Sequence, residues 1–182
     1  MEKKTDRRIV MTKRLLKEAL IELLKEKDIY HVSIRELCSN ADINRTTFYK
    51  YYGSQFDLLS DMENDFLEFI AMTVENYEED PEKIVASICK YLEDHIEFAR
   101  LIINNNVDPD FPQKVFAIDS IKDSALKKFH GHKSDVELEY IYAFLTFGAF
   151  RMVCLWLNKE KRETPAEFAK LVNQMLLFHE LR

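Results

Sequence analysis

The sequence has 182 residues, of which 47% are hydrophobic and 32% charged, with a net charge of −6, three glycines and four prolines. This length fits one large domain or a small domain joined to a larger one, and the few Gly and Pro residues favour helices over a sheet built on tight turns. The N-terminus has no signal-type apolar run and no later segment offers about 20 uncharged apolar residues, so we expect a cytoplasmic protein without a membrane span.

Charge is spread unevenly along the chain. Residues 1–52 carry 12 Lys and Arg against 8 Asp and Glu, whereas residues 53–182 carry 14 against 24. This asymmetry indicates that only the N-terminal third faces a polyanion. The cysteines at 38, 89 and 154 are far apart and have no metal-type spacing, which predicts packing residues rather than disulfide or zinc ligands.

The first two predicted helices lie before residue 42. One apolar stripe at helical spacing marks a helix that ends near Lys27. Its members are Leu16, Ala19, Leu20, Leu23 and Leu24. Ser33-x-x-Glu36 is a capping box that starts a short second helix. Asp42 follows as a turn residue, because Asp tolerates the left-handed conformation better than most residues.

Asn44 is expected to cap a third helix that runs through Tyr52, with Gly53 as its left-handed cap. Another capping pattern at Ser54 opens a long fourth helix that reaches about Tyr77. Further helices are expected at residues 82–95, 96–104, 111–129, 135–158 and 165–181. The prediction is an all-α protein of about nine helices, with a domain at 1–53 and a larger one at 54–182.

Two short capped helices joined by a tight turn, with a supporting helix before them, are typical of a helix-turn-helix, whose second helix enters the DNA major groove. Phe48 and Tyr52 are spaced to pack against Leu37 and Ile43. Four side chains of the same helix then point elsewhere: Arg45, Thr46, Tyr49 and Lys50. Arg and Thr can read base edges, and Tyr and Lys can reach phosphates. Ordinary solvated helix residues are the alternative interpretation.

The stretch SIRELCSNADINRTTFYKYYGSQFDLL, residues 33–59, resembles the N-terminal domain of the TetR (tetracycline-repressor-like) family, whose pattern includes T-[FL]-Y-x-[HY]-F-x-[SN]-K. The resemblance covers about residues 9–62. Residues in register are Leu37, Ala41, Ile43, Thr47, Phe48, Tyr49, Tyr51, Leu58 and Leu59. It implies groove contacts from Arg35, Arg45, Thr46, Tyr49 and Lys50 and phosphate-side positions at Thr47, Tyr51 and Gln55. Asp42, Asn44 and Gln55 replace the usual Gly, Ser and Lys, and Gln55 implies a weaker or rearranged phosphate contact.

Specific reading of DNA by one helix-turn-helix usually requires a dimer on a palindromic site. The segment 137–158 is nearly apolar on all sides, and with the last helix it could form a four-helix interface between two copies. The candidate interface residues are Leu145, Gly148, Ala149, Met152, Leu155, Phe168, Leu171 and Met175. A buried central helix of a monomer is the alternative.

The resemblance also implies a ligand cavity between the middle helices. The candidate pocket residues are Phe66, Phe69, Met72, Tyr91, Phe98, Phe116, Tyr142 and Phe147. The same side chains would equally form an ordinary core. An apolar or aromatic small molecule is the favoured ligand class, because such pockets are mostly apolar. We expect no cofactor, and His130-x-His132 is interpreted as a polar loop rather than a metal site.

The sequence therefore predicts a DNA-binding transcriptional regulator, a homodimeric repressor released by a small molecule. A partner-binding adaptor or co-activator with weak or altered DNA binding is the alternative. No nucleophile and base pair, Gly-rich phosphate loop or metal-ligand spacing points to an enzyme.

Overall fold

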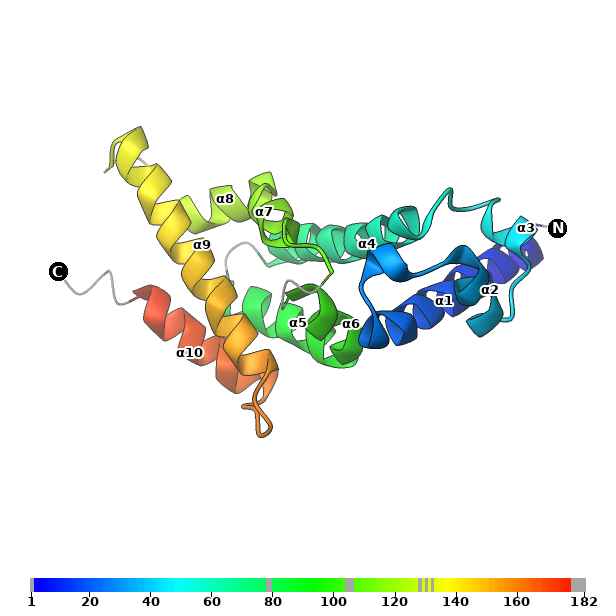
Figure 1. Cartoon of the computed structure of the whole chain (residues 1–182). Coiled ribbons are helices and arrows are strands. Elements are labelled where there is room, and N and C mark those ends of the chain that lie inside the picture. Colours follow the sequence, from blue (N-terminus) through cyan, green and yellow to red (C-terminus); the bar gives the residue numbers. More distant parts are fainter. Residues whose placement is uncertain are drawn as a thin grey trace. The chain divides into compact units, whose positions relative to one another are not determined.

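A computed structural model describes residues 2–77, 80–103, 107–127, 129, 131 and 133–177, and the side chains of 2–6, 176 and 177 are outside this description (Figure 1). These described residues form ten α-helices, one 3-10 helix and no strand, which confirms the all-α prediction. The elements are α1 (Glu2–Glu26), η1 (Ile29–His31), α2 (Ile34–Asn40), α3 (Arg45–Phe48), α4 (Gln55–Asn76), α5 (Pro81–Asp94), α6 (Ile96–Ile103), α7 (Phe111–Phe116), α8 (Asp119–Leu126), α9 (Asp135–Leu157) and α10 (Pro165–Leu177).

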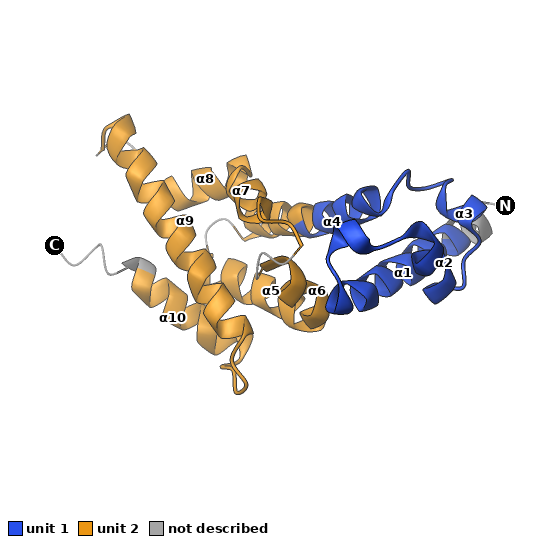
Figure 2. Ribbon diagram, in the orientation of Figure 1, with its two compact units in different colours: residues 1–66 blue, residues 67–182 orange. Residues whose placement is uncertain are grey.

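The chain divides into two compact units, residues 1–66 and 67–182, shown in different colours in Figure 2. The boundary falls inside α4 and not before it, where the sequence had suggested a boundary at residues 53 and 54. The first turns of α4 bury Leu58, Leu59 and Met62, and the apolar stripe that they form belongs to the first unit. A helix that contributes to both units cannot be divided by its capping sequence alone.

The first unit is built around the apolar stripe of α1. Leu16 and Leu20 are fully buried, and so are Leu37 of α2, Phe48 of α3 and Leu58 of α4. Full burial of each such side chain contributes about 1.5–3 kcal/mol. These contacts hold α2 and α3, which have seven and four residues and are too short to be stable alone.

In the second unit, α10 packs along α5 and α9. The buried indole of Trp156 stacks on Phe168 with ring centroids 5.3 Å apart, and its Nε1 donates to the carbonyl oxygen of Glu163 at 2.8 Å. This hydrogen bond satisfies the one polar atom of the indole inside the core. It also fixes the loop between α9 and α10.

The prediction of one helix over residues 111–129 was wrong, because α7 ends at Phe116 and α8 begins at Asp119. Ile118 between them has an extended backbone, with ψ near 115°. The Tyr142 hydroxyl of α9 donates to the carbonyl oxygen of Phe116 at 2.6 Å. A side chain distant in sequence therefore satisfies a carbonyl at the break, which replaces part of the lost helical bonding.

Gly53 is not the left-handed cap that the sequence suggested, since Asp42 and Gly131 are the residues with positive φ among those described. Its amide donates to the Asp57 carboxylate at 2.8 Å, and a Cβ at Gly53 would lie 2.9 Å from the same oxygen. Glycine at 53 therefore allows a close approach of the carboxylate. It does not supply an unusual backbone angle.

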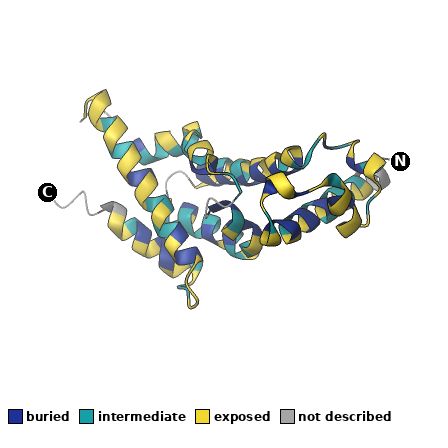
Figure 3. Ribbon diagram, viewed as in Figure 1, coloured by how far each residue is buried: buried dark blue, intermediate teal, exposed yellow. Residues whose placement is uncertain are grey.

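Helix α9 is the one helix in the described part of the chain that is long and apolar enough to cross a membrane. By length and composition alone this is weak evidence, because core helices of soluble proteins meet the same criterion. The helix also contains Arg151, and several of its large apolar side chains are exposed (Figure 3).

Candidate nucleic-acid interface

The amino end of α2 is fixed by the predicted capping box. Ser33 Oγ accepts from the Glu36 amide at 3.2 Å, and the Glu36 carboxylate accepts from the Ser33 amide and hydroxyl. Lys27 at the end of α1 pairs with the same carboxylate at 2.9 Å. The hydrogen bond from Lys27, followed by those from Ser33, lowers the pKa of Glu36 to about 2. One carboxylate thus caps α2 and joins it to α1.

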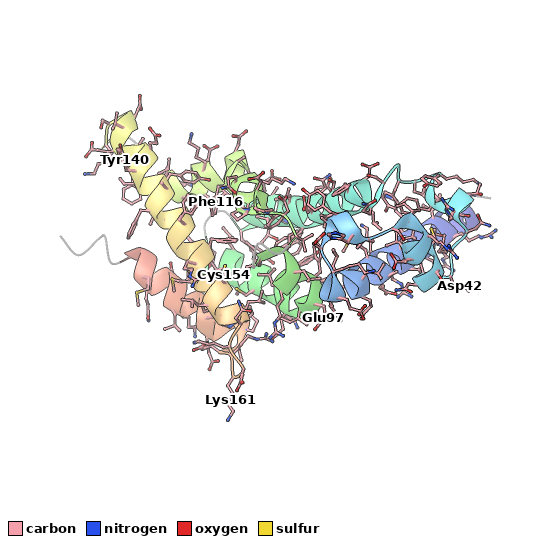
Figure 4. All side chains as sticks on the ribbon, in the orientation of Figure 1. Asp42, Glu97, Phe116, Tyr140, Cys154 and Lys161 are labelled. Atoms are coloured by element: carbon pink, nitrogen blue, oxygen red, sulfur yellow. The ribbon has the colours of Figure 1, made fainter. Side chains whose placement is uncertain are left out.

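The turn between α2 and α3 uses local hydrogen bonds. Asp42 adopts the left-handed conformation with φ of 52°, as its position predicted, and Figure 4 marks it in this turn. The amide of Ile43 donates to the Cys38 carbonyl at 2.9 Å. Asn44 then caps α3 by accepting from the Thr46 amide at 2.8 Å, which confirms it as the cap. The start of α3 is therefore set by residues 42–44.

Helix α3 has a buried face and an exposed face. Phe48 is fully buried and Tyr52 is 5% exposed, as predicted. Tyr49 is 52% exposed, and its ring meets the edge of Phe48 at a centroid distance of 5.5 Å. The other exposed candidates are Arg35 on α2 and Arg45, Thr46 and Lys50 in and just after α3. Exposed polar groups thus occupy the first turn of a short helix whose opposite face is anchored.

The regular part of α3 is shorter than predicted and ends at Phe48. Residues 49–51 continue as a turn in which Tyr51 donates to the Phe48 carbonyl at 2.9 Å and Lys50 to the Thr47 carbonyl at 3.3 Å. Such i to i+3 bonds tighten the last turn of a helix. The tighter turn sets the directions of Tyr49 and Lys50.

The three phosphate-side candidates are less exposed. Thr47, Tyr51 and Gln55 are of intermediate burial. Gln55 Nε2 donates to the Ile29 carbonyl at 3.4 Å, which ties the start of α4 to η1. Where the family pattern has a Lys that can reach phosphate, this chain has an internal hydrogen bond.

One group of residues was missed by the sequence reasoning: Asp61 of α4 with Lys13 and Lys17 of α1. The Asp61 carboxylate lies 3.2 Å from Lys13 Nζ and 2.7 Å from Lys17 Nζ, and it accepts from the Tyr52 hydroxyl at 2.9 Å. The sequence does contain a pattern that could have indicated this cluster. Lys13 and Lys17 are four residues apart on α1, and Asp61 and Asp65 have the same spacing on α4.

The predicted dimer residues fall into two groups. Leu145 and Phe168 are buried, and Ala149 and Met152 are intermediate. Gly148, Leu155, Leu171 and Met175 are exposed. Val136, Tyr140 and Phe144 are further large apolar side chains of α9 that are exposed and were not among the predicted residues, and Figure 4 marks Tyr140 near the amino end of α9.

The predicted pocket residues are not all brought together. Phe69 stacks on Tyr91 at 4.2 Å, and Tyr91 stacks on His95 at the same distance. Phe116 meets Phe147 at 5.0 Å and accepts the Tyr142 hydrogen bond at its carbonyl. The remaining candidates are Phe66 and Phe98, which are buried, and Met72, which is 61% exposed. Phe66 also falls in the first unit and the others in the second.

Within the residues that the structure describes, no three His, Cys, Asp or Glu side chains are grouped so that they could hold a metal ion. His130 and His132, which were predicted to form a polar loop, lie outside those residues.

Comparison with known proteins gives relatives along most of the chain. A family model described as a transcriptional regulator C-terminal region matches residues 79–177. The chain is 21% identical over 169 residues to YxbF, an uncharacterized HTH-type transcriptional regulator of Bacillus subtilis strain 168, and the alignment covers 88% of this chain but 43% of that protein. It is 28% identical over 136 residues to the HTH-type dhaKLM operon transcriptional activator DhaS of Lactococcus lactis strain IL1403, covering 72% of each.

Solved structures support the fold. A TetR transcriptional regulator from Streptococcus agalactiae 2603V is 21% identical and covers 97% of this chain and 99% of its own, with a TM-score of 0.69. A TerR/AcrR-family regulator from Aquifex aeolicus VF5 is 20% identical with a TM-score of 0.66, covering 92% of this chain and 99% of its own. With the helix-turn-helix geometry, the capped turn and the matching C-terminal family model, these findings show that the chain belongs to the TetR family of transcriptional regulators.

Proposed function

We propose that the protein acts as a homodimer that binds a palindromic operator and changes its DNA affinity on binding a small molecule. The observation that carries the proposal is the division of α3: Phe48 is buried while Arg45 and Tyr49 are exposed beside a capped turn. A helix anchored on one face presents the other in a fixed orientation, as base reading requires.

The charge of the N-terminal third supports the same role. Residues 1–52 have an excess of Lys and Arg although the whole chain carries −6. Phosphate neutralisation by such residues supplies most non-specific DNA affinity and makes binding sensitive to salt. Arg45 can add a bidentate contact to guanine, which is a specific contribution.

Exposed apolar side chains on α9 support a second copy of this chain as the partner. Tyr140, Phe144 and Phe147 lie at i, i+4 and i+7, so they share one face, and their exposed fractions are 73%, 66% and 54%. Leu171 and Met175 of α10 are exposed four residues apart. Large apolar patches on a folded protein mark interaction sites, and a two-fold axis would place the same patch on itself.

The proposed ligand class follows from aromatic side chains of the second unit. Aromatic rings of α7 and α9 meet at Phe116 and Phe147, and those of α4 and α5 meet at Phe69 and Tyr91. Such surfaces favour an apolar or aromatic small molecule. The ligand would shift the DNA affinity only if it bound one conformation of the regulator more tightly than the other.

Selection of bound duplexes from a random DNA pool tests operator binding. We expect a palindromic sequence with half-sites about 10 base pairs, or a multiple of that, apart. Affinity for the selected duplex should fall by about three orders of magnitude between roughly 50 and 200 mM salt if six or more phosphates are contacted. Failure to enrich any sequence from the pool, by protein shown to be folded and dimeric, would contradict the proposal.

Activation is the second candidate, favoured by the similarity to DhaS, which is named an activator. The internal hydrogen bond of Gln55 also fits a chain whose DNA contacts have been rearranged toward a partner protein. A reporter gene with the selected operator distinguishes the two signs of regulation. Reduced expression on adding the regulator indicates a repressor, and expression that rises only when the operator lies upstream of the promoter indicates an activator.

A further inference from the structure

Asp61 lies at the centre of a hydrogen-bonded cluster inside the first unit. One carboxylate oxygen accepts from Lys13 at 3.2 Å, and the other accepts from Lys17 at 2.7 Å and from the Tyr52 hydroxyl at 2.9 Å. Lys17 also binds Asp65 at 2.6 Å, and Lys13 Nζ lies 5.4 Å from the centre of the Tyr52 ring. The cluster therefore joins α1, the residues after α3, and α4.

The carboxylates and ammonium groups of this cluster are charged, and Asp61 and Lys17 are partly shielded from water. Side-chain exposure is 27% at Asp61 and 20% at Lys17. Burial alone would raise the pKa of Asp61, but hydrogen bonds from Lys17, Tyr52 and Lys13 outweigh it and the pKa is lowered. Burial would likewise lower the pKa of Lys17, yet its bonds to Asp61 and Asp65 leave that pKa raised. Charged hydrogen bonds of this kind are stronger than neutral ones.

Tyr52 links the cluster to the DNA-facing residues. It follows the tight turn that carries Tyr49 and Lys50, its amide donates to the Phe48 carbonyl at 3.0 Å, and its ring contacts the Phe48 ring at 5.8 Å. A Phe side chain at position 52 would fill the same space without a hydroxyl. The hydroxyl and its acceptor are thus features of this chain that core packing does not require.

We propose that Asp61 is a positioning residue for DNA binding, which holds the turn after α3 through the Tyr52 hydroxyl and holds α1 through two lysines. The inference rests on the proposed operator binding. In this view the cluster fixes the orientation of Tyr49 and Lys50 before DNA binds. The conformational entropy lost by ordering these residues is therefore lost during folding, and it does not reduce the free energy of DNA binding.

Electrostatics and positioning predict opposite effects for loss of this carboxylate. Asp61→Ala removes a negative charge from the DNA-binding unit, releases Lys13 and leaves Lys17 paired with Asp65 alone. Attraction to phosphate would then rise, and binding would become tighter. If Asp61 acts by position, binding becomes weaker despite the favourable change in charge, because the Tyr52 hydroxyl is left without its acceptor and the turn loses its anchor.

The experiment compares operator affinity of Asp61→Ala with Asp65→Ala. Asp65 has the same charge one turn along α4 and binds Lys17 but not Tyr52. We expect Asp61→Ala to weaken binding about tenfold, the equivalent of one charged hydrogen bond. Asp65→Ala should leave affinity unchanged or slightly higher. Circular dichroism at the assay temperature must show both variants fully folded, so that lost stability does not appear as lost affinity.

Tyr52→Phe separates the hydroxyl from the ring. Tyr52→Phe alone should weaken operator binding. The double variant Tyr52→Phe/Asp61→Ala should bind no more weakly than Asp61→Ala, because both substitutions remove the same hydrogen bond between Tyr52 and Asp61. Additive losses in this cycle would show that the two residues act separately and would overturn the positioning role. Equal or tighter binding by Asp61→Ala would overturn it as well.

Hydrogen exchange gives a readout that does not depend on DNA. Asp61→Ala should speed exchange of the amides of residues 49–52 while the amides of α1 around Leu20 stay protected. Unchanged exchange at 49–52 would overturn the proposal. Wild-type protein could enrich no duplex while Asp61→Ala still speeds amide exchange at residues 49–52. That combination would contradict the proposed operator binding but would support the role of Asp61 in holding the turn.

Discussion

At the scale of single residues, the side chains of α3 divide between a buried and an exposed set. Phe48 is fully buried, whereas Arg45 is exposed in the first turn and Tyr49 is 52% exposed just after the last. The exposure of Arg45 and Tyr49 fits the DNA contacts that we propose for them. Their contribution to stability should accordingly be small, since exposed substitutions away from special features change it by about 0.5 kcal/mol or less.

Arg45→Ala and Tyr49→Ala should each weaken operator binding by about 1–3 kcal/mol while the dimer and the melting temperature stay close to wild type. The loss reflects a missing base or backbone contact. A gel-shift or fluorescence anisotropy titration against the selected duplex measures it.

The matched control is Lys83→Ala, which removes one positive charge from an exposed side chain of α5 in the second unit. It should change operator affinity little. Wild-type affinity of Arg45→Ala, with Lys83→Ala unchanged, would remove Arg45 from the interface.

At the scale of elements, the amino end of α2 couples helix formation to pH. The pKa of Glu36 is lowered to about 2 because its carboxylate accepts hydrogen bonds from Lys27 and Ser33. A group whose pKa is lower in the folded than in the unfolded state stabilises the fold above the unfolded pKa, about 4.3 for Glu. That stabilisation disappears as pH falls from about 4.3 to about 2.

Glu36→Gln should therefore flatten the pH dependence of the free energy of unfolding in this acid range. Gln can still accept from the Ser33 amide as in a capping box, so the helix start is kept while the charge is lost. Urea titrations at several pH values between 2 and 6 measure the difference. If the free energy of unfolding had the same pH dependence in the variant and the wild type, the ion pair between Lys27 and Glu36 would not contribute to folding stability.

Elements with local causes could be predicted from the sequence, and those with distant causes could not. The caps at Ser33 and Asn44 and the left-handed Asp42 depend on residues one to three positions away, and each was found. The break between α7 and α8 has no such local signal, because the Tyr142 hydroxyl that binds the Phe116 carbonyl lies 26 residues along the chain.

The same distinction applies to the candidate site. Exposure of Arg45 and Tyr49 followed from helical spacing around Phe48. The Asp61 cluster joins residues 48 positions apart in sequence. The spacing of the lysines on α1 and of the aspartates on α4 identifies them as partners only once the two helices are known to lie side by side. At Gln55, the difference from the family pattern predicted a weaker or rearranged phosphate contact. It could not predict that the Gln55 amide donates to the Ile29 carbonyl oxygen.

At the scale of the whole molecule, α9 exposes a face of large apolar side chains. Tyr140, Phe144 and Phe147 are on one face and each is more than half exposed. Meanwhile Trp156 and Leu157 near the other end of the helix are fully buried. The buried end belongs to the core of the second unit, and the exposed end is available to a second copy. A regulator of this family with two recognition helices would gain specificity from that pairing.

Phe144→Glu should convert the dimer to a monomer, with the dimer dissociation constant raised by about 100-fold or more. In the proposed homodimer a two-fold axis would bring the substitution into the interface twice, and each lost Phe burial costs about 1.5–3 kcal/mol, where 1.4 kcal/mol is a factor of ten. Because Phe144 is 66% exposed within one chain, the folded monomer should lose little stability. Sedimentation velocity at several protein concentrations measures the equilibrium.

Met72→Glu is the control, since Met72 on α4 is 61% exposed and belongs to no part of this face. It should sediment like wild type. Operator affinity provides the second measurement, because a monomer reads one half-site and loses the contribution of the other. If Phe144→Glu remained dimeric and bound DNA normally, the apolar face of α9 would not be the interface, and the recognition helices would have to be paired through another surface.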